Sequence, residues 1–284
     1  MKIAVVLFGV LAVCILISLI YGISRWQGGT RQLRARIEQG RRPALVSHYD
    51  SREVMGLPMP VRRYFETVLH EGQAMVASVE IEHEGTFNMG ESEPQWKRFR
   101  STQLNVMQRP GFDWNGEISM LPGLPVFVHD AYVGGEGILK AELYGLVTMA
   151  SVSGTREAAE GELMRFLAEA AWYPTRLLPS QGVKWESTGE DSARATLVDG
   201  DTRCALDFHF GADGMIDRVR AAARYRTVGN KLEPAPWEGR FWNYQLRDNM
   251  RVPLEGEVAW MLPSGPWPYW RGKTTKLLYR FEGQ

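Results

Sequence analysis

Asp130 is the residue whose position in the sequence best suits acid chemistry. It alternates with Val126, Val128 and Tyr132, so this pattern places a carboxylate on an otherwise apolar face of a strand. Burial on such a face raises the pKa of a carboxyl group unless a partner compensates the charge. The structural alternative is an ion pair with an arginine such as Arg271, or a hydrogen bond with Tyr132.

Four arginines in a second strand-like run form a basic stripe. Alternation puts them on one strand face, where they would bind phosphate or lipid headgroups: Arg218, Arg220, Arg224 and Arg226. The alternative is a solvated face whose arginines pair with carboxylates across the sheet, with Glu255 and Glu257 as candidate partners.

Aromatic residues supply the remaining candidate ligand contacts. Trp172 and Tyr173 precede Pro174, which disfavours helical geometry at the residue before it, so they mark a helix end. There they would form a cavity rim or a membrane-facing edge, or would fasten the helix to the sheet. Trp114, Tyr132 and Trp260 are further candidates, because aromatic side chains line apolar pockets as well as ordinary cores.

Common catalytic and cofactor signatures are absent from the sequence. The five histidines are scattered and no H-E-x-x-H occurs, so no metal site is expected. There is no G-x-S-x-G elbow and no P-loop, and the G-E-G at residues 135–137 lacks the third glycine of a dinucleotide fingerprint. No cofactor is therefore expected. With 33 basic and 33 acidic residues, the formal charge of zero gives no support for a nucleic-acid partner.

An apolar segment at residues 3–24 carries no charge and spans about 33 Å as a helix, enough to cross a bilayer. It is too long for the apolar region of a cleaved signal peptide and has no convincing cleavage site, so an uncleaved anchor is expected. Six arginines follow it between residues 25 and 42, whereas only Lys2 and the amino terminus precede it. Read literally, that charge difference places the following domain in the cytoplasm.

Beyond the anchor (residues 1–24) we expect a basic stem (25–57) and one β-rich domain (58–284). The stem would include a short helix at residues 31–39, and a second helix would begin at Pro60. From Met75 the hydrophobic period changes to two, which indicates strands. About ten or eleven antiparallel strands, interrupted by a helix at residues 155–171, predict a mainly β fold, a curled half-barrel covered by helices.

Several short motifs resemble an uncharacterised family of bacterial membrane-anchored proteins over about residues 58–281. They are LPGLP (121–125), DAY (130–132), WYPT (172–175), LPSQG (178–182), PWEGR (236–240), RVP (251–253), EGE (255–257) and YWRG (269–272). At the level of fold, the helix-covered sheet is similar to the LolA/LolB-like lipoprotein-carrier superfamily. That resemblance implies an apolar cavity for acyl chains and a location outside the cytoplasm. The location is opposite to the one that the arginines after the apolar segment predict.

These observations favour a noncatalytic protein of the bacterial cytoplasmic membrane that binds an apolar or acyl-containing molecule beside the bilayer. The side of the membrane stays open, with a lean to the extracytoplasmic side because a two-residue tail with Lys2 can remain inside. The first alternative is a membrane-anchored assembly module with a filled interior and a protein partner. The second is an enzyme acting on a lipid-like substrate. A continuous apolar cavity would favour the binding protein, and a packed interior would favour the module.

Overall fold

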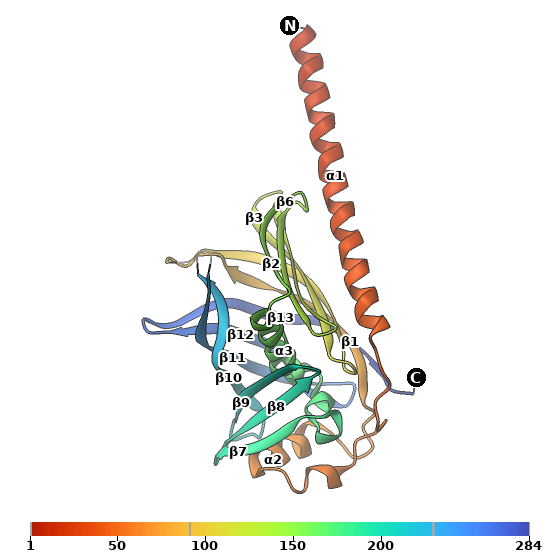
Figure 1. Ribbon diagram of the computed structural model, residues 1–284, viewed down its shortest axis with the longest axis vertical. Helices are drawn as coiled ribbons and strands as arrows, with labels where there is room; N and C mark the ends of the chain where they lie inside the picture. Colours follow the sequence, from red (N-terminus) through yellow and green to blue (C-terminus); the bar gives the residue numbers. More distant parts are fainter. Residues whose placement is uncertain (1, 91, 229–230, 284) are drawn as a thin grey trace.

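One antiparallel sheet of thirteen strands dominates the structure (Figure 1). The computed structural model describes residues 2–90, 92–228 and 231–283. Each strand pairs with the next one along the chain, except that β6 does not pair with β7, and β1 also pairs with β13, so two meanders meet in the middle of the sheet. The strands are β1 (Val76–Asn88), β2 (Trp96–Val106), β3 (Gly111–Leu121), β4 (Leu124–Val133), β5 (Glu136–Leu143), β6 (Val147–Ser153), β7 (Lys184–Gly189), β8 (Ser192–Asp199), β9 (Thr202–Phe210), β10 (Ile216–Val228), β11 (Lys231–Arg247), β12 (Met250–Leu262) and β13 (Gly265–Phe281).

The mainly β class and the curled, helix-covered sheet expected from the sequence are confirmed. The sheet curls without closing, and β6 and β7 are its edges. It has thirteen strands rather than ten or eleven, because the expectation lacked β2 and β6. Strand β2 buries Ser101, Gln103 and Asn105 on its inner face, so its hydrophobic residues do not alternate. Strand β6 is exposed along most of its length, as suits an edge.

Two short helices cover the concave side. Helix α2 (Met59–Val68) packs against β8, β9 and β12 through a buried stripe that includes Tyr64 and Phe65. Helix α3 (Arg156–Ala168) starts at Thr155, whose hydroxyl accepts a hydrogen bond from the Ala158 N–H, and packs on β4, β5, β9 and β10. Short 3₁₀ turns follow it: η2 (Glu169–Trp172), η3 (Pro174–Leu177) and η4 (Pro179–Gln181). Another, η1 (Ser51–Val54), precedes α2.

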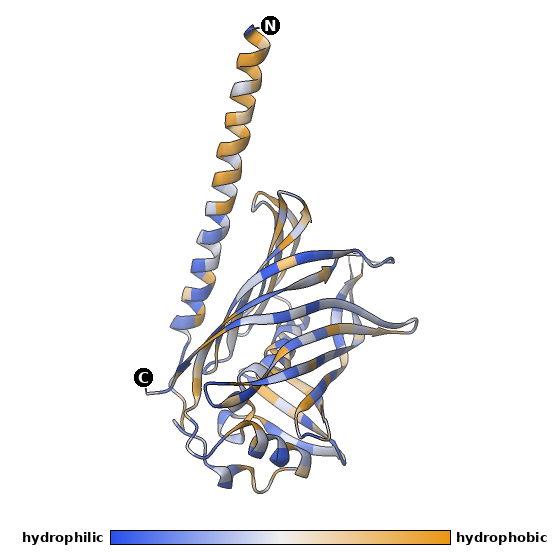
Figure 2. Ribbon diagram, turned by 180° about the vertical axis from the view of Figure 1, so that it is seen from behind, coloured by the Kyte–Doolittle hydropathy of each residue, from blue (hydrophilic) through white to orange (hydrophobic). Residues whose placement is uncertain are grey.

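The first helix, α1 (Lys2–Gln39), has 38 residues and two different halves. Its amino-terminal half projects away from the rest of the chain and is coloured almost wholly hydrophobic in Figure 2; it is long and apolar enough to cross a membrane. Its second half lies on the convex face of the sheet against β2, β3 and β4, with Trp26 and Ile37 buried. The short helix expected at residues 31–39 is therefore the end of one continuous helix.

Candidate binding cavity

Helix α3 crosses the concave face without filling it and leaves a cavity of about 390 Å³. Both halves of the sheet contribute to its wall, because the two meanders curl toward each other around the helix. Most of the lining is aliphatic or aromatic: Phe87, Met89, Trp114, Ile118, Val126, Val128, Leu139, Ala141, Met149, Ala150, Ala168, Trp172, Trp237, Phe241, Val258, Tyr269 and Trp270. Its shape and chemistry therefore suit an apolar ligand.

A second cavity of about 380 Å³ lies along another side of α3. It is lined by the first turns of α3 and by the ends of β10, β12 and β13, including Arg226 and Trp260. The two cavities share the lining residues Phe87, Asp130, Leu139, Arg224 and Tyr269. They are therefore neighbouring parts of the same concave interior.

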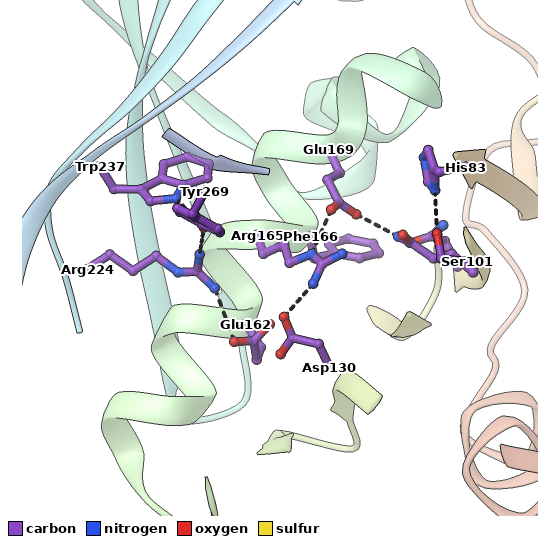
Figure 3. Close-up of polar contacts among 12 residues, drawn as sticks. His83, Ser101, Asp130, Glu162, Arg165, Phe166, Glu169, Arg224, Trp237 and Tyr269 are labelled. Carbon is purple, nitrogen blue, oxygen red and sulfur yellow. Dashed lines mark hydrogen bonds and ion pairs between the residues drawn. The ribbon is translucent and has the colours of Figure 1, made fainter. Parts of the chain in front are cut away.

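Arg165 of α3 organises the charged groups between these cavities (Figure 3). Its guanidinium forms ion pairs with Asp130 of β4 and, at 2.7 Å, with Glu169. It also lies 5.1 Å from the Phe112 ring centroid and 5.4 Å from that of Trp114, within the range of cation–π attraction. The buried cation is thus held by two carboxylates and two aromatic rings.

Arg224 forms a second charged contact with α3 (Figure 3). It donates to Glu162 at 3.1 Å and to the Tyr269 hydroxyl at 3.3 Å, while Trp237 donates its indole N–H to the same hydroxyl at 2.9 Å. Burial, with the negative charge of Asp130 next in size, raises the pKa of Glu162 to about 8. The folded protein therefore favours the protonated form of Glu162 more than the unfolded chain does.

His83 is the histidine that lines the main cavity. Burial lowers its pKa to about 3, with a smaller contribution from the Arg165 charge, so its ring is neutral at physiological pH. Its ring centroid lies 4.9 Å from that of Trp172, and its Nδ1 lies 3.4 Å from the Ser101 hydroxyl. A neutral imidazole packed among aromatic rings adds to the apolar character of the cavity.

Six of the ten residues proposed from the sequence face the interior. Trp114, Asp130, Trp172 and Arg224 line the main cavity, and Arg226 and Trp260 line the second one. The two tyrosines belong to the core instead. Tyr132 donates to Asp199 at 2.9 Å, and Tyr173 donates to the carbonyl oxygen of Phe166 at 2.8 Å.

The four arginines of β10 do not share one face, which corrects the expectation. A β-bulge between Ala221 and Arg224 inserts one extra residue and turns Arg224 inward, opposite Ala235 of β11. Arg218 and Arg220 stay on the outer face and pair with Asp217 at 2.8 Å and Glu238 at 2.6 Å.

The partners expected for these charged groups also differ. Glu255 accepts hydrogen bonds from Trp242 and Asn243, and Glu257 pairs with Arg271 at 2.5 Å on the outer face. Arg271 is therefore on the opposite side of the sheet from Asp130, whose partner is Arg165 instead.

Comparison with protein families identifies the chain. Residues 55–279 match DUF6920, described as a family of unknown function. The protein belongs to the DUF6920 family. This confirms the expected membership of an uncharacterised family. No curated protein matches the chain.

Among solved structures, the DUF6920 chain is similar to the crystal structure of a LolA superfamily protein from Nitrosomonas europaea. The identity is 11% and the TM-score is 0.38, over 79% of this chain and 94% of the other. A likeness this distant agrees with the weak fold-level resemblance seen in the sequence and carries no conclusion about a ligand.

The sequence did not point to Glu162, Arg165, Glu169 or His83 in this DUF6920 protein. The first three recur at spacings of three and four along α3 and its C-cap residue, Glu169, which places them on one side of the helix. That spacing was the available signal, but it is also the pattern of an ordinary solvated helix face. Only the position of α3 inside the half-barrel makes these charges internal.

Proposed function

We propose that this DUF6920 protein is a noncatalytic, membrane-tethered binding protein that holds the apolar part of a lipid-like molecule inside its half-barrel. The observation that carries the proposal is the cavity of about 390 Å³ beneath the curled sheet, with its largely apolar lining. Ligand pockets in proteins commonly measure about 300–1,000 Å³ and are lined in this way. A filled interior, as an assembly module would have, lacks such a space.

The charged groups around the cavity support an apolar rather than an ionic occupant. Arg165 is paired with Asp130 and Glu169, and Arg224 contacts Glu162 and Tyr269. A buried charge that already has partners gains little from a further ligand charge, since desolvation of that ligand charge still costs free energy. Acyl or prenyl chains and other uncharged apolar groups fit this environment.

The polar headgroup of such a lipid-like ligand would lie at the second cavity. There Arg226 lies 5.8 Å from the Trp260 ring centroid, and both residues line the cavity together with Asn88. A lipid-like molecule with its chain in the main cavity would place its head among these polar groups, because the two cavities share lining residues.

Helix α1 supplies the tether in this proposal. Its apolar half has the length and composition of a span across a bacterial cytoplasmic membrane. The rest of the chain would then work beside the bilayer, where lipid-like ligands are concentrated.

Native mass spectrometry of the full-length protein, purified from bacterial cells in detergent, tests the binding. We expect a reproducible copurifying lipid in the unaltered protein and its loss in Ala150→Phe, which places a ring in the main cavity from the edge strand β6. The matched control is Ala222→Phe, an exposed alanine of β10. A clean apo mass in every detergent, or equal loss in both variants, would refute the proposal and favour the assembly module.

A further inference from the structure

Two hairpin turns at one end of the sheet carry no charged side chains. Residues 118–128 form the tip of the β3–β4 hairpin and residues 143–155 include the β5–β6 turn, and neither stretch contains Asp, Glu, Lys or Arg. Large apolar side chains are exposed there: Leu121 (61%), Leu146 (37%), Val147 (60%) and Met149 (55%). At the opposite end of these strands, the β2–β3 and β4–β5 turns do carry charged residues, Arg109 and Glu136. Exposed apolar groups gathered at one end of a molecule mark an interaction surface.

The β5–β6 turn lies against α1 at the end of its apolar stretch. A Cβ added at Gly22 would meet the Tyr144 carbonyl oxygen at 2.3 Å and the Leu146 Cγ at 2.6 Å, so helix and turn are in direct contact. The first charged residue after the apolar stretch is Arg25. Gly22 is three residues earlier, which puts the turn about 4.5 Å inside the boundary of the apolar stretch. Figure 1 shows the ends of β3 and β6 as the part of the sheet that reaches furthest along α1 toward the amino terminus.

Polar contacts fix α1 to the sheet, so specific interactions set the position of the β5–β6 turn along the helix. Arg25 donates to the Gly145 carbonyl oxygen at 2.9 Å and pairs with Glu142. Further along the helix, Trp26 donates to Asn115 at 2.8 Å, and Arg34 pairs with the buried Asp113 at 3.0 Å. These contacts follow α1 over more than two turns and prevent the sheet from swinging away from the helix.

We propose that the β3–β4 and β5–β6 turns insert into the leaflet from which α1 emerges, and that the occupant of this apolar surface is the lipid bilayer itself. The inference rests on the proposed tether, because α1 sets where the bilayer lies. Turns without charge enter the interfacial region at low cost, and Arg25 stays at its boundary with a carboxylate partner.

Insertion gives the cavity a route to its ligand. Ile118 of β3, Val126 of β4 and Met149 of β6 line the main cavity and belong to the strands that end in these turns. Apolar residues that line the cavity therefore lie on the same strands that reach the leaflet. A lipid chain that enters along it avoids crossing water.

Spin labels on the full-length protein in nanodiscs of phosphatidylcholine and phosphatidylglycerol test the insertion. The background is Cys14→Ser, and Cys204 stays unlabelled because it is buried and burial raises its thiol pKa to about 12. The labelled site is Val147→Cys, and the matched control is Val198→Cys, a valine of β8 with similar exposure, 56% against 60%. Ile15→Cys marks the centre of the apolar stretch.

The measurement is collision of each label with oxygen, which concentrates in lipid, and with a water-soluble nickel complex. We expect the oxygen-to-nickel ratio at residue 147 to exceed that at residue 198 several-fold and to approach that at residue 15. Equal ratios at 147 and 198, with residue 15 shielded from nickel, would overturn the insertion and leave the tether intact. Nickel access at residue 15 would overturn both the insertion of the turns and the membrane tether. Lipid binding is tested separately by mass spectrometry.

Discussion

Replacing Arg165 by Met tests whether the interior depends on its buried charges. Arg165 is 15% exposed, and its partners Asp130 and Glu169 are 19% and 12% exposed. The substitution keeps an unbranched apolar stem but leaves two carboxylates buried without their cation. Removal of one member of a buried pair costs about 3–5 kcal/mol, so we expect a loss of that size in the free energy of unfolding. Urea denaturation of the full-length protein in detergent, followed by tryptophan fluorescence, measures it.

The control for this prediction is Arg156→Met on the same helix. Arg156 is 82% exposed and pairs with Glu160 at the same i,i+4 spacing, so its loss should lower the free energy of unfolding far less than the loss of Arg165 does. A triple variant that adds Asp130→Asn and Glu169→Gln to Arg165→Met should recover most of the loss, because no unpaired charge remains. Equal costs for Arg165→Met and Arg156→Met would refute the assignment of Arg165 as a buried charge partner.

Three further variants probe other parts of the structure. The folded-state pKa of Glu162, about 8, exceeds the ordinary 4.5, so the folded protein binds more protons than the unfolded chain and its unfolding free energy falls as the pH rises between those values. Glu162→Gln should flatten this fall in urea titrations at several pH values. Parallel pH profiles of the variant and the unaltered protein would contradict the shift. Gly22→Ala should speed hydrogen exchange in residues 25–39, because its Cβ would lie 2.3 Å from the Tyr144 carbonyl oxygen of the β5–β6 turn. The control Gly9→Ala, in open space, should leave exchange unchanged. Equal exchange rates in the two variants would contradict the docking of α1 on the sheet. Tyr132→Phe removes a hydrogen bond to Asp199 and should cost about 1 kcal/mol in urea without loss of copurifying lipid, whose disappearance would mean that Tyr132 contacts the ligand.

Most strands were predictable from the sequence because each has one buried face and one solvent-exposed face. The period of two located eleven of the thirteen strands and, through them, the class of the fold. Strand β2 escaped detection because its inner face packs Ser101, Gln103 and Asn105 beside the charged groups of α3. A hydrophobic pattern identifies a buried face only where the neighbours of that face are themselves apolar.

The candidate site was harder to predict because it depends on pairings between distant segments. Alternation placed Asp130 on the inner face, but its partner, Arg165, is 35 residues away on a helix whose depth in the half-barrel no local pattern reveals. Arg224 shows a second limit. One extra residue in β10 reverses which side chains point inward, and a bulge of this kind leaves no mark in hydrophobic alternation.

The charges of the interior compensate one another, and this bears on which ligands it admits. Among the described residues that line the main cavity, Arg165, Arg224 and Arg240 each have a carboxyl partner. The Asp130 charge also favours the charged form of Arg224. An anionic headgroup drawn into this cavity would lose its hydration and find no cation without a partner, which is costly. The headgroup is therefore expected to stay at the second cavity beside Arg226, while the chain enters along the strands that meet the leaflet.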